Sequence, residues 1–169
     1  MSLDNPITEW QRIAALARRL YRSERAVAAT EFALLAPIFM LFVCMLLELG
    51  LVLFTQSALD NAARDGARGL RTNKITTSTE FTNAVCGDLG TLIPSCTSKI
   101  QYYIQASSAF SSLSAHTGAL GTTFITGSAG QDMLVQVGYS RTSIIPWAAV
   151  YLGGSQQITS TVAFQNEPY

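Results

Sequence analysis

One uninterrupted apolar segment, residues 32–54, constrains this chain more than any other feature. It reads FALLAPIFMLFVCMLLELGLVLF, and its only charged residue is Glu48. As a helix it would extend roughly 35 Å, and the hydrocarbon core of a bilayer is about 30 Å thick. The segment is longer than the apolar region of a cleaved secretory signal, and no small-residue cleavage site follows it. We therefore expect a retained membrane-spanning helix rather than the core helix of a soluble protein.

The composition agrees with a membrane segment attached to one small domain. Hydrophobic residues make up 49% of the 169 residues, charged residues make up 13%, and the formal net charge is zero. This composition is apolar for a soluble globule of that length. Neither a global positive field nor a basic patch interleaved with aromatic residues is present, so nucleic acid is not an expected partner.

The orientation of the span rests on two features. Basic residues occur on both sides of it, so the positive-inside bias is weak, but Arg25 lies closest to the apolar run. Downstream, Cys86 and Cys96 are spaced as a short disulfide loop, residues 86–96, which requires an oxidising compartment. We expect a cytoplasmic N-terminus and an extracytoplasmic C-terminal domain. Residues 1–26 form a basic leader, either an amphipathic helix on the membrane surface or a solvated segment.

The helical pattern continues beyond the lipid. It runs from Ala26 to about Gly69, and Pro37 inside it should cause only a mild kink. Its outer half carries a stripe of mostly small residues, which we call the small-residue stripe: Leu59, Ala62, Ala63, Gly66, Ala67 and Leu70. Small residues four apart allow another helix to approach closely, so this stripe predicts partner helices.

The remaining residues, 71–169, predict a small domain of mixed structure. A short helix is expected at 79–89, and alternating patterns predict strands at 100–106, 131–140 and 157–165. A Ser, Thr and Gly-rich loop spans 107–130, and a corner containing Pro146 and Trp147 spans 144–152. We expect an α+β fold: a long N-terminal membrane-spanning helix, residues 27–70, followed by an antiparallel β-sheet packed against a helix.

The chain lacks the residue sets that catalysis requires. His116 is the one histidine and lies in the polar loop, and the acidic residues outside the membrane segment are scattered. No phosphate-binding glycine loop and no metal-ligand spacing occur, so we expect neither an enzyme nor a cofactor or metal. Two carboxylates remain, Glu31 at the start of the span and Glu48 near its far end. Glu48 either reaches toward the headgroups or makes a helix contact in an assembly.

Three sequence elements together resemble the TadE-like family of the tight-adherence (Tad/Flp) type IV pilus systems. They are Thr30-Glu-Phe-Ala-Leu-Leu-Ala-Pro37, Leu47-Glu-Leu-Gly50 and Ala58-Leu-Asp-Asn-Ala-Ala-Arg-Asp-Gly-Ala-Arg68. The resemblance is strong over residues 22–70, and the ending at 166–169 is also similar. It implies a minor pseudopilin: a structural, non-enzymatic component of a pilus used for adhesion, biofilm formation and surface attachment.

The resemblance to prepilins also implies a processing step. The prepilin peptidase would cut between Ala26 and Val27, which makes Glu31 the fifth residue of the mature chain and its assembly carboxylate. The new ammonium of one subunit could then neutralise Glu31 of its neighbour. The implied partners are the major pilin, other pseudopilins, the prepilin peptidase and the inner-membrane assembly platform. The implied location is the bacterial inner membrane, crossed once, with the C-terminal domain periplasmic or extracellular.

A second hypothesis follows from the residue before the cut. Prepilins usually carry glycine there, and this chain has Ala26. An uncleaved protein would be a permanently anchored scaffold of the pilus or secretion machinery.

Overall fold

A computed structural model describes residues 11, 14–15, 24–145, 149–150 and 154–168 of the chain. The chain divides into two compact units, Met1–Leu46 and Leu47–Tyr169. Most of the expected leader and the Pro146-Trp147 corner lie outside the described residues. The second unit begins within the long helix, upstream of the boundary near residue 70 that the sequence indicates.

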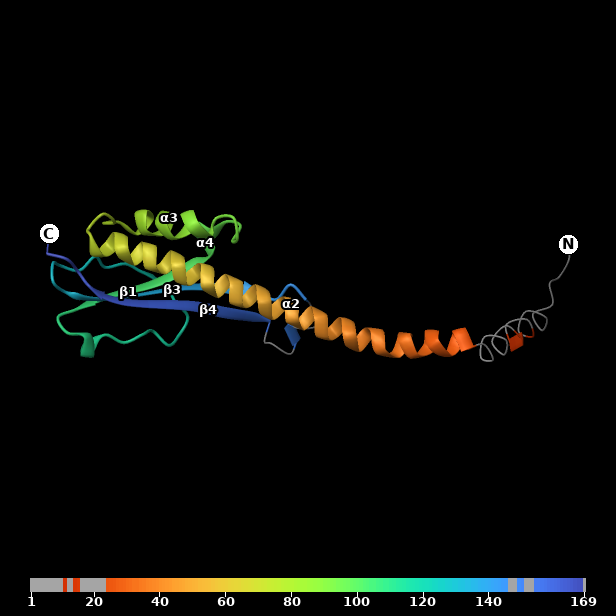
Figure 1. The fold of residues 1–169 in the computed structure, drawn as a ribbon. Helices are drawn as coiled ribbons and strands as arrows, with labels where there is room; N and C mark the ends of the chain where they lie inside the picture. The colour runs from red at the N-terminus through yellow and green to blue at the C-terminus, as the bar shows by residue number, and fades with distance from the viewer. Residues whose placement is uncertain (1–10, 12–13, 16–23, 146–148, 151–153, 169) are drawn as a thin grey trace, which may run out of the picture. The chain divides into compact units, whose positions relative to one another are not determined.

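The long helix is α2, Glu24–Arg71, and it runs without interruption through Pro37 (Figure 1). This confirms the helix predicted from Ala26 to about Gly69. One stretch of it, Val27–Arg71, is long and apolar enough to cross a membrane, and only 11% of its most apolar window is buried. A core helix of a soluble protein would be mostly buried. The apolar side chains of this segment are instead exposed, Phe32 by 73% and Leu34 by 74%.

Two short helices follow α2, and a disulfide joins them. Helix α3, Ser78–Leu89, is the helix predicted at 79–89, and α4 is Cys96–Lys99. Thr77 and Glu80 form a capping box at the start of α3. The backbone N–H groups of Thr76 and Thr77 donate to the Glu80 carboxylate, which lowers its pKa. Cys86 of α3 is bonded to Cys96 of α4.

The sheet contains four strands in the order β2-β1-β3-β4. The three predicted strands are present as β1, Ile100–Ser107, β3, Asp132–Thr142, and β4, Ser155–Gln165, and they pair antiparallel. The expectation of a purely antiparallel sheet is wrong, because β2, Thr122–Thr123, pairs parallel to β1. A strand of only two residues inside a polar loop has no sequence period that could predict it.

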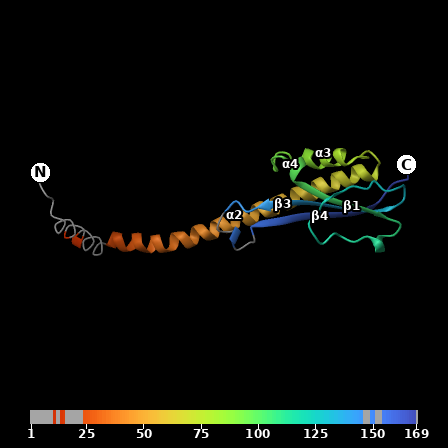
Figure 2. The same cartoon turned by 180° about the vertical axis from the view of Figure 1, so that it is seen from behind.

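The core lies between one face of the sheet and two helices. Cross-strand partners Ile104, Val135 and Val162 share this face, as do Tyr102 and Val137. Helix α3 and the part of α2 after Leu47 pack on it, and the views from both sides show α3 and α2 along the sheet (Figures 1 and 2). The small-residue stripe is buried here, with every member at most 3% exposed or classed as buried.

The small-residue stripe therefore packs within its own domain. An added Cβ at Gly66 would lie 2.8 Å from Cε2 of Phe81 and 3.1 Å from Cγ2 of Val85. The ring of Phe81 in turn contacts Tyr102 of β1 edge to face, with centroids 5.3 Å apart. The sequence predicted a close approach at this stripe. The approaching helix is α3 of the same chain.

Part of the loop at 107–130, around His116, lies on the opposite face of the sheet, whereas Phe124 packs against the core. It contains the 3₁₀ turn η1, Phe110–Ser112, and strand β2. The side chain of Gln136 on β3 binds both the N–H and the carbonyl of His116, at 2.9 and 3.2 Å. Buried Asn166 donates to the carbonyls of Thr126 and Ser128. Leu134 and Gln136, on the far face of β3, are also buried, and Gln136 is held there by its two bonds to His116.

Substitution Gly66→Leu should test the packing of α2 on α3. Overpacking at this contact should lower the free energy of unfolding by about 1–3 kcal/mol, because Phe81 and Val85 must shift. The measurement is chemical unfolding of the full chain in detergent, followed by far-UV circular dichroism. The matched control is Gly87→Ala in α3, where no atom lies within 4 Å of an added Cβ, so the stability should rise by up to about 1 kcal/mol. Equal effects at the two sites would contradict the packing described.

Candidate functional site

The residues at the predicted processing site lie in the first turns of α2. The backbone of Ala26 and Val27 is helical, and the side chain of Val27 is 51% exposed. Thr30 Oγ1 donates to the carbonyl of Val27 at 2.8 Å. Glu31 is exposed one turn after Val27, next to the exposed ring of Phe32. The described residues provide no basic partner for Glu31.

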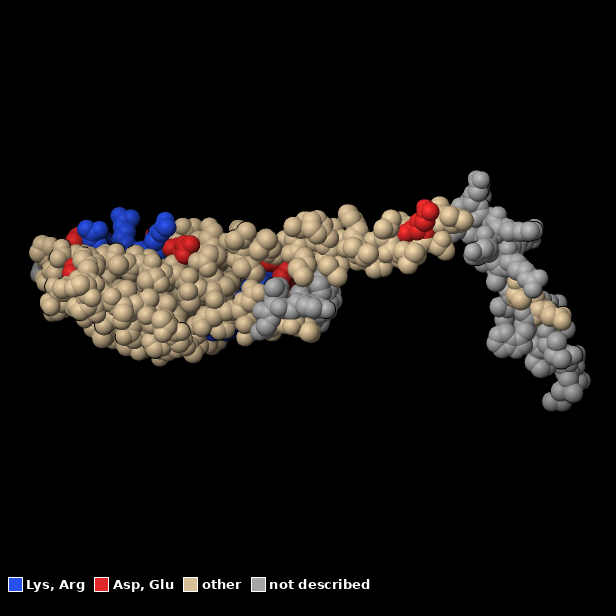
Figure 3. Space-filling view, turned by 90° about the horizontal axis from the view of Figure 1, so that it is seen from below, with Lys and Arg blue, Asp and Glu red and all other residues tan. Residues whose placement is uncertain are grey.

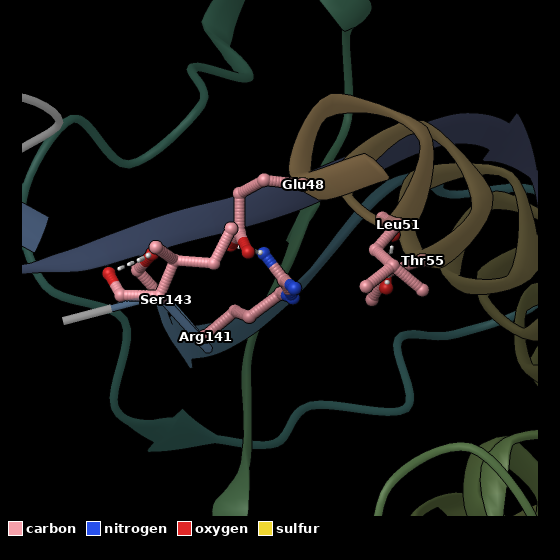
Figure 4. A network of polar contacts seen from close by, with 6 residues as sticks. Glu48, Leu51, Thr55, Arg141 and Ser143 are labelled. Carbon is pink, nitrogen blue, oxygen red and sulfur yellow. Dashed lines mark hydrogen bonds and ion pairs between the residues drawn. The ribbon is translucent and has the colours of Figure 1, made fainter. Parts of the chain in front are cut away.

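The second carboxylate, Glu48, has a different environment. It is 3% exposed, and its Oε1 lies 2.6 Å from Nη1 of Arg141 (Figure 4). Arg141 is itself 8% exposed and comes from the end of β3, far away in the sequence. Both groups belong to the unit Leu47–Tyr169. The pair fixes the end of β3 to α2 at the start of this unit.

The energetics of the pair make it a structural constraint. Moving two charges out of water costs several kcal/mol per ion, which the mutual attraction offsets only when the pair is intact. Nη2 of Arg141 is buried and has no hydrogen-bond partner among the described residues. Among those residues, Glu48 is the group that neutralises the charge of this guanidinium. Removing the carboxylate would leave an uncompensated buried cation. The pair therefore favours the arrangement in which the end of β3 lies beside Glu48 of α2.

The sequence identifies Glu48 as a candidate contact residue, but it does not identify Arg141. A signal was available: Arg141 is the only charged residue between Asp132 and Glu167. Burying an unpaired charge is costly, so a single cation among apolar strands and a single anion inside an apolar helix are expected to pair with each other. Sequence position alone did not reveal that β3 runs back along α2.

The structure also describes the surroundings of His116 and of Cys44. His116 is exposed and its ring lies against Tyr103, with centroids 5.1 Å apart. Cys44 is a free thiol on α2. Within the described part of the chain, no group of three or more His, Cys, Asp or Glu residues could hold a metal ion. The arrangement suits binding and packing.

Substitution Glu48→Gln should destabilise the domain more than an exposed pair would predict. We expect a loss of about 3–5 kcal/mol in the free energy of unfolding, because Arg141 remains buried and charged. The double variant Glu48→Leu/Arg141→Met should recover most of this loss. The control is Glu167→Gln, whose ion pair with Arg71 is half exposed and should contribute at most about 1 kcal/mol. A double variant as unstable as Glu48→Gln would argue against the pair as the cause.

Comparison with known proteins finds a family to which the helical segment is similar. Residues 26–68 match the family model described as TadE-like protein. The match includes Val27, Glu31, Glu48 and the small-residue stripe up to Ala67. No curated protein and no solved structure gave a match. Over residues 26–68 the chain is therefore similar to the TadE-like proteins, which confirms the resemblance drawn from its sequence.

Proposed function

We propose that this protein is a minor pseudopilin of a Tad-type pilus, anchored in the bacterial inner membrane. The observation that carries the proposal is the TadE-like match over residues 26–68, which contains an exposed carboxylate at the start of an exposed apolar helix. A soluble domain would bury such a helix. A subunit that is first held in lipid and then bundled with other subunits would expose it.

The position of Glu31 supports an assembly role. A carboxylate beside Phe32 and Leu34 is costly in a low-dielectric environment unless a cation neutralises it. If the chain is cut after Ala26, the new ammonium at Val27 supplies that cation. Within one helix the two groups are a turn apart, and when neighbouring helices stagger they can pair between subunits. Partners are then the major pilin, other pseudopilins, the prepilin peptidase and the inner-membrane platform.

The C-terminal domain supports a location outside the cytoplasm. The disulfide between Cys86 and Cys96 persists in an oxidising compartment. We place the N-terminus in the cytoplasm and this domain in the periplasm or at the cell surface. In this reading the protein performs no chemistry, and the pilus that it helps to build provides adhesion and surface attachment.

The alternative is an uncleaved scaffold that stays in the membrane and supports assembly. Ala26, in place of the glycine usual before the cut, favours this alternative. It would keep the basic leader, and Glu31 would then have no neighbouring N-terminal ammonium to pair with.

Intact-mass spectrometry should distinguish the two functions. Co-expressed with an active prepilin peptidase, the purified protein should begin at Val27, whereas a peptidase-inactive strain should yield the full chain. The variant Ala26→Gly provides the positive control for cleavage. An intact leader in the wild type together with a cut Ala26→Gly variant would count for the scaffold.

The variant Glu31→Ala should test the assembly carboxylate. A pseudopilin should lose about tenfold or more of its co-purification with the other pilus subunits, because an unpaired ammonium would remain in the helix bundle. Asp88→Asn, which removes an exposed carboxylate on α3, should leave co-purification unchanged. If Glu31→Ala leaves co-purification with the other pilus subunits unchanged, the result would favour the anchored scaffold.

A further inference from the structure

The two edges of the sheet differ in length. One edge is β2, a strand of 2 residues, and the other is β4, a strand of 11 residues. An edge strand presents unpaired backbone N–H and C=O groups, which another strand can pair with. Short length protects the β2 edge. The β4 edge has no such protection.

The sequence of β4 lacks the usual devices that block strand addition. It reads SQQITSTVAFQ, without a charged residue or a proline. Its pairing with β3 is continuous from Asp132↔Gln165 to Thr142↔Ser155, so no bulge bends the edge away. Beyond the pairing with β3, one hydrogen bond reaches its backbone from the described residues, from Gln56 Nε2 to the carbonyl of Thr159 at 3.1 Å. From Thr161 to Gln165, the described residues make no hydrogen bond to the outer edge of β4.

A groove lies beside this open part of β4. Its volume is about 390 Å³, and it lies between α2 and β4. It is lined by three apolar residues, three arginines, one threonine and one glutamate: Ala67, Val162, Phe164, Arg64, Arg68, Arg71, Thr72 and Glu167. Figure 3 shows basic side chains along one edge of the domain, with acidic side chains beside them. A strand added to β4 would place every second side chain into this groove, because side chains alternate between the two faces of a sheet.

The charge of the groove is positive. Arg71 is paired with Glu167, with Nε and Oε1 3.3 Å apart, and both side chains are about half exposed. Arg64 and Arg68 are exposed, and the described residues provide no ion pair for either. Guanidinium groups bind carboxylates in a bidentate geometry. The groove therefore suits a segment with acidic side chains on the face toward α2.

We propose that the β4 edge binds a β-strand of a partner protein by strand addition, with acidic side chains of that strand contacting Arg64 and Arg68. A second copy of this chain does not fit the charge. Because β4 contains no acidic residue, antiparallel pairing of two β4 edges would place two arginine rows on the same face of one sheet. The proposal depends neither on cleavage after Ala26 nor on the role of Glu31. Strand addition could therefore be disproved while the pseudopilin function holds, and the pseudopilin function could be disproved while strand addition holds.

The test uses the full chain in detergent micelles and three labelled nine-residue peptides, measured by fluorescence anisotropy. The acidic peptide alternates glutamate with threonine and valine. A basic peptide has lysine in place of each glutamate. A third peptide keeps the glutamates and replaces its central threonine and valine residues with proline, which prevents strand pairing without changing the charge.

The acidic peptide should bind, and the basic and proline peptides should bind about tenfold more weakly or not at all. In the variant Arg64→Glu/Arg68→Glu the preference should reverse toward the basic peptide. In Arg64→Gln/Arg68→Gln both charged peptides should bind weakly. The matched control is Lys74→Glu/Lys99→Glu, which reverses two exposed charges outside the groove and should change acidic-peptide binding less than about twofold.

Three results of the binding assay would overturn the proposal. They are no binding of the acidic peptide, equal binding of the acidic and proline peptides, and a charge preference that survives Arg64→Glu/Arg68→Glu. Cross-linking of two chains through cysteines introduced at exposed Thr161 and Ala163, at the same efficiency with and without the acidic peptide, would assign the edge to a second copy and also overturn it.

Discussion

The close approach of α2 to α3 and the sheet is the contact on which the rest of the domain depends. Gly66 has no Cβ, and this leaves room for Phe81 and Val85 at the surface of α2. Phe81 extends this contact to Tyr102 of β1. One helix thus provides the inner wall of the whole core. A larger residue on this stripe would separate three elements at once, because protein interiors are packed too densely to absorb it.

This use of the stripe changes how the helix can contact other subunits. The sequence pattern of small residues four apart is the pattern of helix association in membranes. In this chain, the outer half of the pattern is already occupied by α3 and the sheet. The surface left for other helices lies earlier in α2, where Phe32, Leu34 and their neighbours are exposed around Glu31. Intramolecular packing and the assembly contacts that we propose therefore involve different parts of one helix.

The two carboxylates of α2 follow the same division. Glu48 is satisfied inside its own domain by Arg141, while Glu31 is exposed and has no basic partner among the described residues. Both carboxylates interrupt or border an apolar segment, so each requires a cation. The difference is the source of that cation. For Glu48 it is a strand of the same fold, and for Glu31 we propose that it is another subunit.

The sequence by itself determined the elements that have strong local signals. These are the long apolar helix α2, the helix α3 and the three long strands β1, β3 and β4, because apolar periodicity is a local property. The resemblance of residues 26–68 to TadE-like proteins could also be predicted from the sequence alone. The tertiary structure decided what depends on distant residues meeting. It placed Arg141 on Glu48, directed Gly66 toward Phe81, brought β2 parallel to β1 and left β4 open beside three arginines. None of these has a sequence period, since each arises from how strands and helices that are far apart in the chain lie against each other.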